Sequence, residues 1–272
     1  MSEVDNEDVD QVNDLPGMCE RRGSSIPRFW EIDYFRGVAI VMMIIFHVAF
    51  DMAYFGIVNL GVHTAPWRAL AVCTASLFLL LVGISLTLSS ARAQKTLKRR
   101  DFLLKYLRRG AGIMGLGFLL TLLTLILVPK EPILFGILHL IGFSVILSTL
   151  FIRYTWVNFF AGLGAIFVGW RIEGIPGPSC LLWLGVHPPG FTSLDYTPVF
   201  PWIGAVLIGV WLGHLIYPGG QRRSGLSIPQ LPCKDVLCYA GRHSLVIYLL
   251  HQPVIILIII MLWSPAGIFP LQ

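Results

Sequence analysis

An apolar run that begins at Arg36 and carries His47 and Asp51 inside it constrains this chain more than any other feature. Ionisable side chains are costly at membrane depth, and where they occur they usually mark a functional site. As a helix, the run places His47 about 16 Å beyond Arg36, near the middle of a bilayer core about 30 Å thick. Asp51 lies four residues later on the same helix face, where it would orient or charge the imidazole. We therefore predict a functional site inside the membrane; the alternative is a hydrogen bond that only joins two helices.

The composition of the whole chain is that of a membrane protein. Of its 272 residues, 56% are hydrophobic and 13% are charged, which is far from the average of soluble globular domains. The chain has room for seven spans of about 20 residues and for no soluble domain of useful size. We predict an all-α, polytopic bundle of seven transmembrane helices, at about 36–55, 69–89, 110–128, 132–152, 155–171, 198–217 and 243–264.

The positive charges predict how these spans are oriented. All but three of the 20 Lys and Arg residues fall on one side of the seven-span arrangement, and the exceptions are Arg68, Lys130 and Arg171. Cationic residues concentrate in cytoplasmic loops. We therefore expect a cytoplasmic N-terminus and an extracytoplasmic C-terminus, in a multi-pass protein of the plasma membrane.

The two ends of the chain are expected to lie outside the bundle. Residues 1–27 are predicted to be a disordered cytoplasmic tail, since the first 20 residues hold seven carboxylates and no apolar run. Residues 28–265 would form one transmembrane domain, and residues 266–272 a short outer tail. The five cysteines are scattered, and no zinc spacing, phosphate loop or nucleophile elbow occurs, so neither a metal centre nor nucleic-acid binding is expected.

Two segments on the expected outer side carry further candidate residues. The loop 56–68 contains His63, in the sequence His63-Thr-Ala-Pro-Trp67. Such a histidine is either a general base that meets an outer acceptor or an ordinary exposed residue. The segment 173–198 is rich in Pro and Gly, and its apolar part, 180–186, is too short to span a membrane. We expect a re-entrant or interfacial element there.

Further candidates lie within or beside the predicted spans. His139 is expected at a depth similar to that of His47, so the two imidazoles either face one cavity or His139 only packs, with one hydrogen bond. Asp33 and Arg36 bracket the start of the first helix, where an arginine either binds a phosphate that enters the bundle or only sets the topology.

The last predicted helix carries two more polar side chains on one side. Tyr248 and His251 lie three residues apart and so share a helix face, with His251 about 12 Å into the membrane. Pro253 interrupts the helical hydrogen bonds near this depth, which suits the wall of a cavity.

Four segments of the chain together resemble the transmembrane acyltransferases. They are Ile32-Asp33-Tyr-Phe-Arg36-Gly37 with the His47 that follows it, Ser76–Ser85, Gly136–Gly142 and Gly241–Pro253. Within that superfamily the chain most resembles the heparan-α-glucosaminide N-acetyltransferase catalytic-domain family, over about residues 28–265. His63 and Trp67 are similar to an outer-loop pair of that family, and some relatives are expected to carry Asn where this chain has His47.

The resemblance implies an enzyme that acts across a membrane. The acyl donor would be acetyl-CoA on the cytosolic side, and the acceptor an amino sugar or a hydroxyl of a glycan or glycoconjugate on the other side. The implied partners are thus acetyl-CoA, the acceptor and membrane lipids, with no metal, and a homodimer through apolar helix faces is compatible with this reading. The site residues expected are His47, His63 and Asp51 for catalysis, and Arg36, Asp33, His139, Tyr248 and His251 for holding the donor.

The rival hypothesis is a small proton-coupled transporter or flippase without acyl-transfer activity. The intramembrane His, Asp and Arg would then form a proton relay or a substrate pathway. The sequence shows no internal repeat of the kind that many transporters contain, which counts against this hypothesis.

Overall fold

The computed structural model describes residues 29–62, 64–223 and 231–263. The predicted tails at 1–27 and 266–272 and the candidate His63 therefore lie outside the described residues. The regular elements of the described part are helices: α1 (Trp30–Tyr54), α2 (Ala65–Thr96), α3 (Arg99–Leu127), α4 (Ile137–Phe151), α5 (Thr155–Ile172), η1 (Ser179–Leu184), α6 (Val199–Ile216), η2 (Pro218–Gly220), α7 (Lys234–Arg242) and α8 (Ser244–Trp263).

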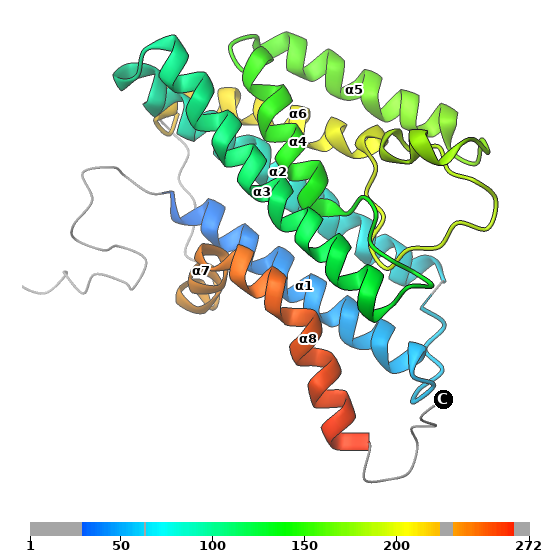
Figure 1. Ribbon diagram of the computed structural model, residues 1–272. Helices are drawn as coiled ribbons and strands as arrows, with labels where there is room; N and C mark the ends of the chain where they lie inside the picture. Colours follow the sequence, from blue (N-terminus) through cyan, green and yellow to red (C-terminus); the bar gives the residue numbers. More distant parts are fainter. Residues whose placement is uncertain (1–28, 63, 224–230, 264–272) are drawn as a thin grey trace, which may run out of the picture. The chain divides into compact units, whose positions relative to one another are not determined.

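The chain divides into two compact units. Unit 1 comprises residues 1–60 and 230–272, and unit 2 comprises residues 61–229. In unit 1, both α7 and α8 pack against α1, so helices from the two ends of the sequence lie side by side (Figure 1). In unit 2, the closely packed pairs are α2 with α6, α5 with α6, and α3 with α4.

The helices confirm a polytopic all-α membrane protein. Five of them, α1, α2, α3, α6 and α8, are long and apolar enough to cross a membrane, and α4 is a shorter apolar helix. Each predicted span coincides with one helix of the structure. The number of seven spans and the orientation of the termini stay predictions.

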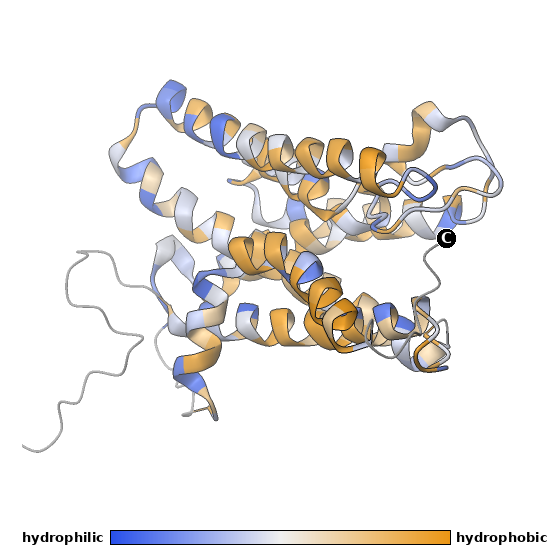
Figure 2. Ribbon diagram, turned by 60° about the horizontal axis from the view of Figure 1, so that its bottom comes forward, coloured by the Kyte–Doolittle hydropathy of each residue, from blue (hydrophilic) through white to orange (hydrophobic). Residues whose placement is uncertain are grey.

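Large apolar side chains are exposed on the outside of these helices. Ile126 and Leu127 at the end of α3 are 70% and 67% exposed, and Trp170 of α5 is 66% exposed. Figure 2 shows hydrophobic residues along the helices and hydrophilic residues mainly towards their ends. Such a surface is stable when hydrocarbon chains surround it, which agrees with membrane insertion.

Several boundaries differ from the predicted ones for local reasons. Helix α4 begins at Ile137 rather than near 132, because the preceding residues form a turn in which the Ile133 amide donates to Thr124 Oγ1 at 3.0 Å. Helices α2 and α3 extend into the cationic segment between them, since Ala, Gln, Lys and Arg all favour helix. The polar helix α7 lies in a segment that we expected to be a loop.

Glycines allow the backbones of neighbouring helices to touch. A Cβ on Gly83 of α2 would collide with the backbone at Val206 of α6, and one on Gly209 of α6 would collide with the backbone of Leu80. Thr87 then reaches across, and its hydroxyl donates to the Val210 carbonyl at 3.1 Å. Close approach at small residues is a common basis of helix association in membranes.

We predict opposite effects for two glycine-to-alanine substitutions. Gly83→Ala forces α2 away from α6 and should cost about 1–3 kcal/mol, as overpacking does. Gly115→Ala on α3, where a Cβ meets nothing within 4 Å, should be neutral or stabilise by up to about 1 kcal/mol. The midpoint of thermal unfolding in detergent compares the two, and equal midpoints would contradict the close α2–α6 contact.

Candidate functional site

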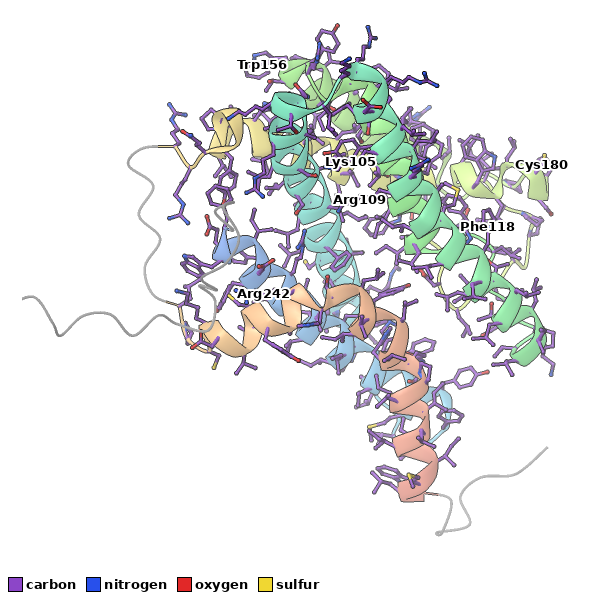
Figure 3. All side chains as sticks on the ribbon, turned by 60° about the vertical axis from the view of Figure 1, so that its left-hand side comes forward. Lys105, Arg109, Phe118, Trp156, Cys180 and Arg242 are labelled. Atoms are coloured by element: carbon purple, nitrogen blue, oxygen red, sulfur yellow. The ribbon has the colours of Figure 1, made fainter. Side chains whose placement is uncertain are left out.

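The first cluster of charged side chains lies near the start of α1 in unit 1. Arg36 Nη1 is 3.4 Å from Asp33 Oδ1, and Arg242 Nε, at the end of α7, is 3.5 Å from Asp33 Oδ2. Two guanidinium groups thus flank one carboxylate, and all three side chains are mostly buried. Figure 3 labels Arg242 among these side chains.

Two glycines explain why these charges meet. A Cβ on Gly37 would collide with the backbone of Leu237 in α7, and one on Gly241 would collide with the backbone of Asp33 in α1. Each glycine is the sequence neighbour of one arginine, so the same contact that joins the two helices brings Arg36 and Arg242 to Asp33. In the sequence, Arg242 served only as one of the positive charges that predict the orientation. Its position directly after Gly241 could have identified it as a partner of Asp33.

The second cluster pairs two histidines further along α1. The ring centroids of His47, on α1, and His251, on α8, lie 4.8 Å apart with a 60° angle between the planes. His251 Nδ1 lies 2.6 Å from the Tyr248 carbonyl oxygen. Since a carbonyl oxygen only accepts, Nδ1 donates this bond, and in the neutral ring Nε2 is the basic nitrogen. The sequence placed Tyr248 and His251 on one face, and the structure shows that the Tyr248 backbone fixes the tautomer of His251.

His47 itself is half-buried between its neighbours. Its Nδ1 atom is buried and has no hydrogen-bond partner among the described residues, while the ring of Phe46 lies against it edge-on. The expected orientation of His47 by Asp51 stays a prediction, since the ring contacts of His47 are with Phe46 and His251.

Asp51 is held by an amide from the opposite helix. The Gln252 Nε2 atom donates to both carboxylate oxygens of Asp51, at 2.8 and 3.0 Å. The Asp51 side chain is 3% exposed, and a buried carboxyl is stable only with such partners. No role was assigned to Gln252 from the sequence. Its amide stands in an otherwise apolar run, between His251 and Pro253, and this position could have identified it as a buried hydrogen-bonding residue.

His139 lies in unit 2, where it stabilises the α3–α4 turn. Its Nδ1 accepts the Gly136 amide at 3.2 Å, so Nε2 carries the proton and donates to Thr121 Oγ1 at 3.4 Å. Gly117 of α3 leaves room for the ring, because a Cβ there would lie 2.9 Å from Nδ1. The side chain is 2% exposed. A contact between His139 and an acyl donor, or a cavity shared with His47, stays a prediction.

The segment 173–198 of unit 2 is ordered around a short 3-10 helix, η1, at the place where a re-entrant or interfacial element was predicted. Tyr196 donates its hydroxyl to the Leu182 carbonyl at 2.8 Å, and burial raises the pKa of this phenol. The rings of His187 and Phe191 pack against Tyr196.

Hydrogen bonds fasten the end of this segment to the α3–α4 turn. Asp195 Oδ2 accepts the Ile137 amide at 3.0 Å, at the start of α4. Ser193 donates to the Pro132 carbonyl at 2.8 Å, and the Thr197 amide donates to the Phe135 carbonyl at 3.0 Å. The segment is therefore part of unit 2 and not a loose loop.

Residues 29–62, 64–223 and 231–263 contain no group of three or more His, Cys, Asp or Glu side chains that could bind a metal ion. The buried polar groups of unit 1 are instead suited to moving protons and to binding an anion. His47 of α1 and His251 of α8 are neighbouring imidazoles in an apolar setting, and Arg36 of α1 with Arg242 of α7 offers guanidinium groups nearer the start of α1.

Comparisons with known proteins identify the family of the chain. No curated protein and no solved structure matches the chain. A family model, described as heparan-alpha-glucosaminide N-acetyltransferase, catalytic, matches residues 28–253 and so includes α1, all the helices of unit 2, α7 and the half of α8 that carries His251 and Gln252. The resemblance seen in the sequence is thereby confirmed, and the chain belongs to the heparan-α-glucosaminide N-acetyltransferase catalytic-domain family of membrane acetyltransferases.

Proposed function

We propose that this protein moves an acetyl group from cytosolic acetyl-CoA to an amino sugar or a hydroxyl of a glycan or glycoconjugate on the extracytoplasmic side of the plasma membrane. The family supports the reaction class. One observation supports assigning the reaction to particular residues: the rings of His47 and His251 form a pair, with centroids 4.8 Å apart.

The paired imidazoles suit the proton transfer that the reaction needs. In the proposed step, His47 takes the proton of the acceptor amine or hydroxyl while the acceptor nitrogen or oxygen attacks the thioester carbonyl. A carbon–nitrogen or carbon–oxygen bond forms, the carbon–sulfur bond breaks, and the sulfur leaves as a thiolate that is then protonated. His251, whose Nδ1–H donates to the Tyr248 carbonyl and whose basic nitrogen is therefore Nε2, is proposed to receive or relay that proton.

The two arginines near the start of α1 are proposed to hold the donor phosphates. Arginine binds phosphate through charge-assisted, often paired hydrogen bonds. Asp33 fixes both guanidinium groups before the donor arrives. The acyl arm would then extend along α1 for about 16 Å to reach His47, past Tyr248 and His251 of α8.

The acceptor is proposed to approach from the opposite side of the membrane. His63, in the loop between α1 and α2, is the proposed second base on that side. The variants described below test whether His47, His63 or both remove the acceptor proton. The aromatic cluster of His187, Phe191 and Tyr196 offers flat apolar faces against which sugar rings pack. A homodimer stays a prediction.

Substitution of His47 should abolish transfer while the donor still binds. We predict that His47→Gln lowers the rate of acetyl transfer by about 10²–10⁴-fold, the usual contribution of a general base, with acetyl-CoA affinity unchanged. His63→Gln should also abolish transfer if the loop histidine acts as the second base. Transfer is measured with radiolabelled acetyl-CoA and an amino sugar, and binding by calorimetry.

The matched control for both variants is His243→Gln. His243 is an exposed histidine at the start of α8, and its Nδ1 donates to the Tyr239 carbonyl at 2.9 Å. This variant should keep the full rate. Wild-type rates in His47→Gln and His63→Gln would overturn the assignment, and a protein that binds no acetyl-CoA at all would favour the transporter hypothesis.

Loss of either arginine should weaken donor binding. We expect Arg36→Gln and Arg242→Gln each to raise the dissociation constant for acetyl-CoA by about 10- to 100-fold, since a hydrogen bond to a charged group contributes about 1.5–3 kcal/mol. The rate at saturating donor should change much less. Arg171→Gln, at the end of α5, is the control and should bind acetyl-CoA as the wild type does. Equal affinities for acetyl-CoA in all three variants would mean that Arg36 and Arg242 only set the membrane topology.

A double variant separates the structural and chemical roles of Asp51. Gln252→Met leaves the Asp51 carboxyl buried without its amide donor and should cost about 1–3 kcal/mol of stability. Adding Asp51→Leu should restore much of this loss, because replacing both partners by apolar groups is nearly neutral. If Asp51 also positions the reacting groups, the double variant recovers its unfolding midpoint and not its rate. Recovery of both would make the pair purely structural.

A further inference from the structure

Two adjoining cavities in unit 2 differ in the polar groups that they offer. The first, of about 590 Å³, lies at the turn between α4 and α5; Arg153, Thr155 and His214 contribute polar groups to a lining that is otherwise aromatic and apolar. The second, of about 410 Å³, is a groove lined almost entirely by apolar side chains of α4, α5, α6 and η1. Val157 lines both, so the cavities meet at this residue.

The turn that carries the polar cavity is fixed from two sides. His214 of α6 donates its Nε2–H to the Ile152 carbonyl at 2.6 Å, directly before Arg153. Asn158 of α5 donates its amide to the Phe151 and Tyr154 carbonyls at 2.8 and 2.7 Å. Arg153 and Thr155 are therefore presented by a preformed turn, and none of the residues that line this cavity is acidic.

Aromatic side chains mark this turn as the edge of the membrane. Tyr154 and Trp156 are both 60% exposed, and Trp156 contacts the ring of Trp211, 6.3 Å away. Figure 3 labels Trp156 at the start of α5. Tyrosine and tryptophan concentrate at the headgroup level of bilayers, where arginine also meets anionic lipid.

The groove has the length and the lining of a single hydrocarbon chain. Its lining includes a row of small residues on α5, Ala161, Gly164 and Ala165, and also Trp183 of η1. From Val157 to Val168 the row extends about 16 Å along α5, close to half of a hydrocarbon core about 30 Å thick. That is the depth that one acyl chain covers within one leaflet. Gly164 leaves open space beside the helix, since a Cβ there meets nothing within 4 Å.

We propose that unit 2 binds one anionic phospholipid of the leaflet at the Arg153 end, with its phosphate beside Arg153 and Thr155 and one acyl chain in the α4–α5–α6 groove. The order of the two cavities matches the order of the lipid: charge at the headgroup level, aromatic residues at the boundary, and an apolar channel below. This binding site is independent of acetyl transfer.

The test is retention of lipid by the purified protein, measured by native mass spectrometry. The probes are phosphatidylglycerol and phosphatidylcholine with the same acyl chains, added to protein in detergent. We expect the wild type to retain one phosphatidylglycerol in preference to phosphatidylcholine and to unfold at a higher temperature with it. Arg153→Gln should remove the preference between the two lipids.

Gly164→Leu fills the groove and should weaken retention at least about tenfold, the effect of excluding roughly two methylene groups. Gly115→Leu is the matched control, because Gly115 also faces open space but lies on α3 outside both cavities; it should retain the lipid as the wild type does. Ala161→Leu is a second groove-filling variant in case Gly164→Leu unfolds.

Three outcomes would overturn the proposal. The groove is not the site if Gly164→Leu and Ala161→Leu, both folded, retain lipid as the wild type does. The occupant is not an anionic lipid if both headgroups are retained equally and Arg153→Gln changes nothing. If detergent alone fills the groove and neither phospholipid displaces it, the site does not select a lipid.

Discussion

Contact between helix backbones at glycine is the constraint on which the charged cluster of unit 1 depends. Gly37 and Gly241 bring α1 and α7 so close that neither position admits a Cβ. At this distance the Asp33 carboxylate lies between Arg36 and Arg242, and the arginines are held in a partly buried place where their charges are poorly screened. The packing of α1 on α7 and the pairing of both arginines with Asp33 are thus two results of one contact.

Further along α1, where it packs against α8, the surroundings change from charged to nearly apolar, and hydrogen bonds orient the polar side chains. The Tyr248 carbonyl occupies one nitrogen of His251, and Gln252 occupies both oxygens of Asp51. In unit 2, both ring nitrogens of His139 take part in hydrogen bonds, one with Gly136 and one with Thr121. The hydrogen bonds that orient each histidine are thus set by its immediate neighbours in the structure.

The sequence predicted the helices well and the pairings less well, for physical reasons. Hydrophobic runs in the sequence located α1 to α6 and α8, and five of these helices, α1, α2, α3, α6 and α8, have the length and apolar character that a bilayer core requires. The polar helix α7 was missed, since its place in the structure comes from packing on α1 and not from hydrophobicity. Residues on one helix, such as Tyr248 and His251, were related correctly by their spacing. The partnerships of His47 with His251 and of Asp51 with Gln252 depend on how α8 is rotated against α1, which spacing within a single helix does not determine.

The hydrogen bonds that fasten the segment 173–198 to the α3–α4 turn begin at Ser193 and continue through Asp195 and Thr197. The preceding stretch, from His187 to Phe191, contains two prolines and a glycine, and it takes no part in those bonds. Its two rings, of His187 and Phe191, pack against each other. The residues that hold the segment on the α3–α4 turn are therefore different from the residues whose rings pack together in the same segment. Substitutions between residues 187 and 191 therefore leave the side-chain donors and acceptors that join the segment to the α3–α4 hairpin unchanged.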